Sequence, residues 1–151
     1  MFTKMKKSTI GWAATVVCLT FAGVSDARCV GGYAGQPAGG AALSCFNEFF
    51  GAVQSTCSGG HNWEVPLMTD SSGAKTVHMT GSAGANALSC STYGLNSTAT
   101  SYWAGSQLNW VNQGATYYTS TGASIPSGGY LYVYCSFAGA GAQLDTLDWN
   151  S

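Results

Sequence analysis

The sequence predicts an all-β protein, an antiparallel β-sandwich of about eight short strands held by one or two disulfides. Three observations support this class. Runs rich in Tyr, Trp, Val, Leu and Thr alternate with clusters of Gly, Asn and Ser at short intervals. No stretch beyond residue 53 sustains the apolar spacing of a helix. The chain also has 6 cysteines and an amino-terminal stretch typical of exported proteins.

Residues 1–27 are expected to form a cleaved signal peptide of bacterial type. Three early lysines precede an uncharged run over residues 8–25, and the small residues Ser25 and Ala27 suit a peptidase cleft. A retained membrane anchor is the alternative, but the apolar run is shorter than the roughly 20 residues that a spanning helix needs. The sequence therefore predicts a secreted protein, periplasmic or extracellular, with no membrane span after processing.

The exported chain is expected to have two parts. Residues 28–42 are rich in Gly and Ala and predict a flexible lead-in, whereas residues 43–151 predict a single sandwich domain. The start of this domain, residues 43–53, is ambiguous. Its apolar residues recur at helical spacing, but Gly51 and the aromatic density suit a strand, which we favour.

A series of short strands is predicted to follow. Residues 63–69 and 75–80 flank a Gly-containing turn over residues 70–74, which favours a hairpin between the two strands. Pro66 lacks an amide donor, so the first of these strands is expected at a sheet edge or a bulge. The remaining expected strands are 87–93, 101–103, 107–111, 115–120, 130–137 and 143–149.

Removal of the signal peptide leaves an odd number of cysteines, so at least one lacks a partner within the chain. Spacing alone does not decide the pairing. We expect Cys90–Cys135 and Cys45–Cys57, which on a loop-entropy estimate contribute about 4 and about 3 kcal/mol. Cys29 is then left over and available for self-association or an intermolecular disulfide. No C-x-x-C spacing occurs, and we expect neither a metal nor another cofactor.

Residues 130–137 form the clearest strand, with strict alternation between two kinds of side chain. One face carries Leu131, Val133 and Cys135, and the other carries Tyr130, Tyr132 and Tyr134. We expect the aliphatic face with the cysteine to point into the core. The tyrosine row then faces outward.

An outward tyrosine row predicts a flat aromatic platform when Trp103, Trp110 or Tyr117 lies beside it. Sugar rings stack on such platforms while neighbouring Asn, Gln and Ser side chains bind their hydroxyls. Carbohydrate or another cell-surface component is therefore the expected partner. The plain alternative is that Tyr is a favourable strand residue, which forms cross-strand pairs without a ligand.

Catalytic chemistry finds little support in the sequence. Cys57 lies four residues before His61, but a disulfide would prevent an activated thiol there. His61 and Glu64 resemble half of a metal site, although a strand need not place them on one face. The five carboxylates of the exported chain are scattered and reveal no glycosidase pair. We expect a non-catalytic protein, with a small secreted hydrolase as an alternative.

The exported chain carries few charges. Two basic residues, Arg28 and Lys75, stand against five acidic ones. Nucleic acids and anionic membranes are bound chiefly through lysine and arginine, so this balance argues against both as partners. Surface binding or adhesion is the favoured role. Low charge and exposed strand edges keep a structural subunit of an extracellular fibre or coat as an alternative.

Four short segments resemble those of a loose group of small exported bacterial β proteins of unknown function. They are VPLM at 65–68, LSCS at 88–91, YVYC at 132–135 and LDW at 147–149. The resemblance covers residues 43–150 and implies a disulfide-containing β fold, without any activity. Such proteins have a cysteine before the Pro-Leu pair, where this chain has Val65.

Overall fold

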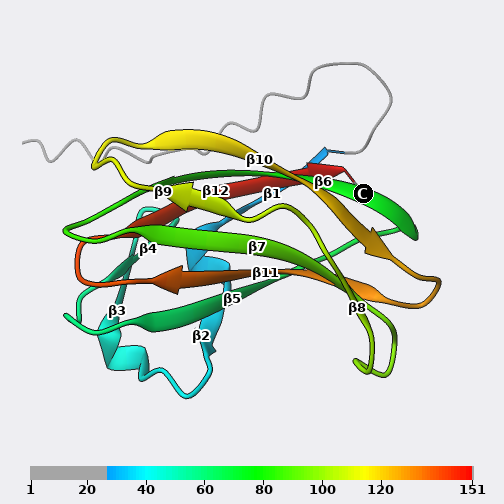
Figure 1. Cartoon of the computed structure of the whole chain (residues 1–151), viewed down its shortest axis with the longest axis horizontal. Helices are drawn as coiled ribbons and strands as arrows, with labels where there is room; N and C mark the ends of the chain where they lie inside the picture. Colours follow the sequence, from blue (N-terminus) through cyan, green and yellow to red (C-terminus); the bar gives the residue numbers. More distant parts are fainter. Residues whose placement is uncertain (1–26, 151) are drawn as a thin grey trace, which may run out of the picture.

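The computed structural model describes residues 27–150, and Figure 1 shows them as two layers of strands. Each layer is a 6-stranded sheet with antiparallel pairing. The predicted all-β sandwich is therefore confirmed. Residues 1–26 lie outside the described residues, so the signal peptide and its cleavage stay a prediction.

The first layer, sheet A, has the spatial order β10-β6-β12-β4-β3, with β1 also paired to β12. Its strands are β1 (Ala27–Gly31), β3 (Phe46–Phe49), β4 (Ala52–Ser55), β6 (Gly73–Ser82), β10 (Thr116–Ile125) and β12 (Gln143–Asn150). The second layer, sheet B, has the order β2-β5-β11-β7-β8, with β9 also paired to β7. Its strands are β2 (Gln36–Ala38), β5 (His61–Leu67), β7 (Leu88–Leu95), β8 (Tyr102–Ala104), β9 (Leu108–Trp110) and β11 (Tyr130–Phe137).

The hydrophobic core lies between the two sheets and follows from the alternation of the long strands. In β11, Leu131, Val133 and Cys135 are fully buried, as the strand pattern predicted, and Phe137 is fully buried as well. The opposing layer supplies Val77, Met79, Leu144 and Leu147. The buried Trp63 donates its indole N–H to the Gly32 carbonyl oxygen at 2.9 Å, which satisfies its polar group.

The prediction that residues 28–42 form a separate, flexible lead-in is wrong. This segment contributes β1, which pairs with β12, and β2, which pairs with β5. A 3-10 turn, η1 (Gly32–Ala34), lies between them. Backbone ladders need no large side chains, so a segment rich in Gly and Ala can close the edges of both sheets.

The ambiguous segment over residues 43–53 forms a single 3-10 turn, η2 (Leu43–Cys45), and then the β3–β4 hairpin. The strand that we favoured is confirmed. Phe50 and Gly51 have φ angles of 48° and 89°, as expected for a two-residue turn with positive φ at both positions. The helical spacing of the apolar residues is thus incidental, because the chain reverses at Gly51.

The predicted hairpin between residues 63–69 and 75–80 is wrong, because β5 belongs to sheet B and β6 to sheet A. The loop between them crosses from one layer to the other instead. Three contacts hold it: Trp149 donates to the Met68 carbonyl, Lys75 donates to Ser71, and Arg28 pairs with Asp70. Each strand has an apolar face, so packing the two strands on opposite sides of the core buries both faces.

Both predicted disulfides are confirmed. Cys90 and Cys135 lie directly opposite each other on β7 and β11, and both are buried. Cys45 and Cys57 join η2 to the loop that follows β4. Cys29 is disulfide-bonded as well, so the expectation that it is left over is wrong. No cysteine among residues 27–150 is free.

Among the described residues, no helix has the length and apolar character needed to cross a membrane.

Candidate functional site

The outer surface of sheet B carries a group of tyrosines that the backbone register brings together. We call it the tyrosine face, and its members are Tyr93, Tyr102, Tyr130, Tyr132 and Tyr134. Tyr132 lies opposite Tyr93 in the β11–β7 ladder, and Tyr102 lies opposite Leu95 in the β7–β8 ladder. Their strand neighbours Leu131 and Val133 point into the core, so the tyrosine row faces outward, as predicted.

The Tyr93 ring contacts two other rings of this group. Tyr93 and Tyr132 are stacked, with ring centroids 5.2 Å apart and an interplanar angle of 20°. Tyr102 meets Tyr93 edge-on at 5.8 Å. Sequence alone does not predict that Tyr93 and Tyr102 belong to this group, because their position depends on the register between strands far apart in the chain.

Polar side chains border the rings on the β5 side. Glu64 lies opposite Tyr134 in the β5–β11 ladder, and Gln36 lies opposite Glu64 in the β2–β5 ladder. The Gln36 side-chain amide donates to Glu64 Oε1 at 2.6 Å. Ser91 faces Tyr134 from the other neighbouring strand. The surface therefore combines aromatic rings with hydroxyl, amide and carboxylate groups.

The surroundings of Tyr132 keep its phenol protonated. Burial is the main cause that raises the pKa of Tyr132 above its ordinary value of 10.0, and the nearby Tyr93 and Glu64 raise it further. The hydroxyl therefore remains a hydrogen-bond donor at neutral pH. The stacked pair presents aromatic rings with polar tips, an arrangement that suits contact with a polar, ring-shaped ligand.

Two tryptophans that were predicted to join the platform do not. Trp110 is 1% exposed and donates its indole N–H to the Thr116 carbonyl at 2.8 Å, so the prediction is wrong for this residue. Trp103 lies opposite Gly94, whose register places it on the core side of β7. It therefore points to the other side of β8 from Tyr102, although it is 42% exposed.

Tyr117 also lies apart, because it belongs to sheet A. It stacks on His78 with ring centroids 5.2 Å apart, and His78 Nδ1 is 2.8 Å from Thr119 Oγ1. Asp148 lies opposite His78 on β12. Burial raises the pKa of Asp148, whereas the neighbouring His78 lowers it. This group is a small polar cluster on the opposite layer from the tyrosine face.

The cysteine and histidine that were weighed as catalytic partners do come together. Ligand atoms of Cys45, Cys57 and His61 all lie within 4.8 Å of one another. Both sulfurs, however, are joined in the Cys45–Cys57 disulfide. A disulfide sulfur is neither a thiolate nucleophile nor a good metal ligand, so the cluster supports neither role in the oxidised protein.

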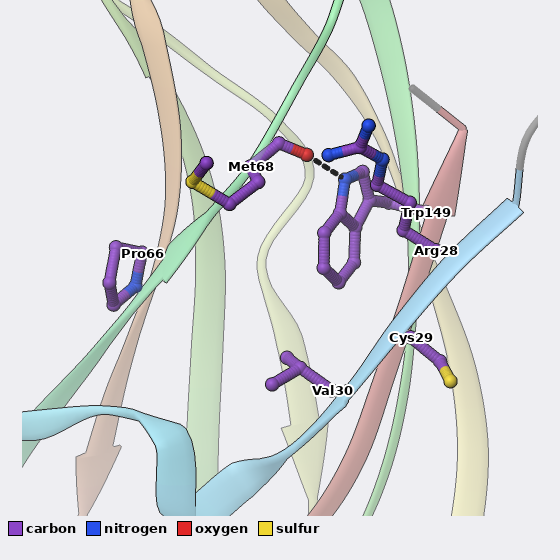
Figure 2. Close-up of a pocket in the computed structure, with 6 residues that line it drawn as sticks. All are labelled: Arg28, Cys29, Val30, Pro66, Met68 and Trp149. Carbon is purple, nitrogen blue, oxygen red and sulfur yellow. Dashed lines mark hydrogen bonds between the residues drawn. The ribbon is translucent and has the colours of Figure 1, made fainter.

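A groove of about 400 Å³ lies between the two layers, where β1 faces β5 (Figure 2). It is lined by Arg28, Cys29, Val30, Pro66, Met68 and Trp149. The Trp149 indole N–H is already donated to the Met68 carbonyl, and the Arg28 guanidinium pairs with Asp70. The main polar groups at its rim are thus occupied, and the groove is less suited than the tyrosine face to binding a hydroxyl-rich ligand.

Searches by sequence and by structure give different results. No family model matches the chain, and no curated protein sequence matches it. Solved structures do match. The C-terminal CBM6 of LamC, a marine laminarinase from Zobellia galactanivorans, aligns with a TM-score of 0.54 at 14% identity over 83% of this chain and 100% of its own.

Two further carbohydrate-binding modules show the same likeness. The CBM36-1 domain of a xylanase from the hindgut metagenome of Trinervitermes trinervoides has a TM-score of 0.54 at 11% identity, over 83% of this chain and 98% of its own. A module of Cellvibrio mixtus lichenase 5A, solved with cellotriose, has a TM-score of 0.50 at 14% identity, over 82% and 96%. At such low identity these matches establish a shared β-sandwich fold.

Proposed function

We propose that this chain is an exported, non-catalytic carbohydrate-binding protein and that the tyrosine face is its binding surface. The observation that carries the proposal is the stacked Tyr93–Tyr132 pair, with Tyr102 beside it, on the outer surface of sheet B. Tyr93 and Tyr132 are partly exposed, Tyr102 is exposed, and the group lies outside the core. It provides the apolar surface on which the C–H groups of a sugar ring stack.

The bordering polar groups complete the chemistry that a sugar needs. The Gln36 side-chain amide donates to Glu64 Oε1 at 2.6 Å, and Glu64 lies opposite Tyr134 in the β5–β11 ladder, so both groups are near a ligand bound there. Amide and carboxylate groups bind sugar hydroxyls as donor and acceptor, respectively. The structural neighbours support this interpretation, because one of them was solved with cellotriose and others belong to a laminarinase and a xylanase.

The same surface supports the proposal that the protein is non-catalytic. A glycosidase usually needs two carboxyl groups about 5–9.5 Å apart across the scissile bond. Among the strands of sheet B in the described chain, Glu64 is the single acidic side chain. An exo-β-1,3-galactanase from Phanerochaete chrysosporium also matches this fold, at a TM-score of 0.53 and 12% identity, but over only 30% of its chain.

Affinity electrophoresis through gels that contain laminarin, xylan or hydroxyethyl cellulose tests the proposal. We expect retardation of the wild-type protein in at least one gel, and a loss of about tenfold or more in affinity for Tyr93→Ala and for Tyr132→Ala. Tyr117→Ala is the matched control, since it removes an exposed, ring-stacked tyrosine from sheet A. Thermal unfolding checks that each variant is folded. Retardation that survives both sheet B substitutions would overturn the assignment.

A further inference from the structure

The charges of the described chain are divided unequally between the two sheets. Glu64 is the one formally charged side chain in the strands of sheet B. Arg28 and Lys75, the basic residues of the described segment, belong to strands of sheet A. Arg28 is paired with Asp70, and Lys75 is 3% exposed and donates to Ser71. The tyrosine face therefore carries a carboxylate and no cation.

The rings add to this negative character. The face of an aromatic ring carries partial negative charge, which attracts a cation within about 6 Å of the ring centroid. The Tyr93 ring centroid lies 5.8 Å from that of Tyr102 and 5.2 Å from that of Tyr132, so a ligand on Tyr93 is near both other rings. A compact group of phenol rings beside a carboxylate is an arrangement that recognises ammonium groups.

Glu64 retains capacity for a further hydrogen bond. It is partly exposed, and its Oε1 accepts one hydrogen bond from Gln36. An ionised carboxylate offers about four lone-pair positions, so this bond leaves room for a charged donor of a ligand. Glu64 lies directly opposite Tyr134, and Tyr134 neighbours Tyr132 on the same face of β11. A sugar stacked on these rings would therefore place its substituents close to the carboxylate.

From these observations we infer that the tyrosine face prefers polysaccharides whose sugar rings carry protonated amino groups over neutral and acidic ones. The inference rests on the proposed function, because it names the sugar class for the same surface. Each ammonium contact with a ring or with Glu64 is expected to strengthen binding about two- to fivefold. Uronic acid polymers are expected to bind more weakly than neutral ones, because the surface offers them a carboxylate and no cation.

Two oligosaccharides of equal length separate the inference from the proposed function. One is a β-1,4-linked glucosamine oligomer and the other is its fully N-acetylated form, which has the same backbone without the positive charge. Calorimetric titrations in a mildly acidic buffer of low ionic strength give both affinities. We expect the glucosamine oligomer to bind about tenfold more tightly, with an advantage that shrinks as salt is added.

Two glutamate variants test whether Glu64 is responsible. Glu64→Gln should lower the affinity for the glucosamine oligomer about two- to fivefold more than the affinity for the N-acetylated oligomer, because only the former loses an ion pair. Glu48→Gln is the matched control, because it removes the same charge from an exposed position on β3 of sheet A. It should leave both affinities unchanged. Thermal unfolding confirms that both variants are folded.

The possible results lead to different conclusions. Equal binding of both oligomers, lost together in Tyr132→Ala, would overturn the inference and leave the proposed function standing. Equal loss of the preference in Glu64→Gln and Glu48→Gln would also overturn it, since the cause would then be the net charge of the protein. Binding of neither oligomer would overturn the inference, and the proposed function would then depend on the neutral polysaccharides alone.

Discussion

Individual residues show where alternation along a strand predicts the site and where it does not. The eight residues of β11 alternate strictly, so the sequence alone placed Tyr132 outward and Val133 inward. Trp110 lies in β9, which has only three residues, and both its neighbours Asn109 and Val111 are exposed. A strand of three residues is too short to show an alternation of apolar and polar side chains. The sequence therefore predicts Trp110 at the surface, although its ring fills the core.

Asp148 makes a pH-dependent contribution to stability that its burial explains. Because its pKa is raised above 3.8, the folded chain holds this proton more tightly than the unfolded chain does. The resulting stabilisation is fully present below the unfolded pKa and is lost as the pH rises through the folded pKa. Asp148→Asn cannot ionise, so we expect it to be more stable than the wild type near pH 7.

Urea unfolding over a series of pH values measures this effect. The difference between Asp148→Asn and the wild type should vanish below the unfolded pKa of about 3.8 and appear above it. Glu48→Gln, which changes an exposed carboxylate on the same sheet, should show no such trend. A variant that is less stable than the wild type near pH 7 would show that attraction to His78 outweighs the cost of burial.

Among the structural elements, long strands were predictable and the connections between them were not. Each expected strand after residue 60 has an observed counterpart, from β5 to β12. The turn after β5 has the length and the Gly of a hairpin, yet it crosses between layers. Turn chemistry fixes the local reversal of the chain, whereas the choice of sheet depends on which apolar faces meet in the core.

The close approach of β7 to β10 depends on Gly94. A Cβ at this position would lie 1.9 Å from the Ser124 carbonyl oxygen, so a side chain forces the two sheets apart. We expect Gly94→Ala to lower the free energy of unfolding by about 2 kcal/mol or more. Gly114→Ala is the control, since a Cβ there meets nothing within 4 Å, and it should change stability by about 0.5 kcal/mol or less.

Chemical denaturation of both glycine variants gives the comparison directly. Gly94→Ala should unfold at a clearly lower denaturant concentration with an unchanged slope. Equal midpoints for the two variants would mean that the sheets separate freely at this point. The packing of β7 against β10 would then not be tight.

For the whole molecule, two disulfides in different surroundings are expected to differ in reactivity. Cys90 and Cys135 are buried in the middle of sheet B, at 1% and 0% exposure, whereas Cys57 is partly exposed. A mild thiol reductant acting on the folded protein should therefore open Cys45–Cys57 first. Alkylation followed by peptide mass spectrometry reports which thiols appear. Simultaneous opening of both bonds would indicate that the sandwich unfolds as a unit before reduction.

The fold was predictable because the cysteine pairs, the alternating strands and the turn residues agree with one another. The structure of the Gly-rich segment over residues 28–42 was not predictable, because β1 and β2 are held by backbone pairing and by the Trp63 bond to Gly32. Only part of the tyrosine face was predictable, because pairing between strands also determines its membership. Its β11 members follow from local alternation, whereas Tyr93, Tyr102 and Glu64 join them only through pairing between distant strands.

The central claim is that carbohydrate binds to the tyrosine face, and NMR titration of the ¹⁵N-labelled protein tests it most directly. The probes are soluble β-1,4-linked oligomers of glucose and of glucosamine. We predict chemical-shift changes that concentrate on the backbone amides around Glu64, Tyr93, Tyr102, Tyr132 and Tyr134, with the larger response to glucosamine. Changes confined to the groove around Trp149, or the absence of any change with either oligomer, would contradict the claim.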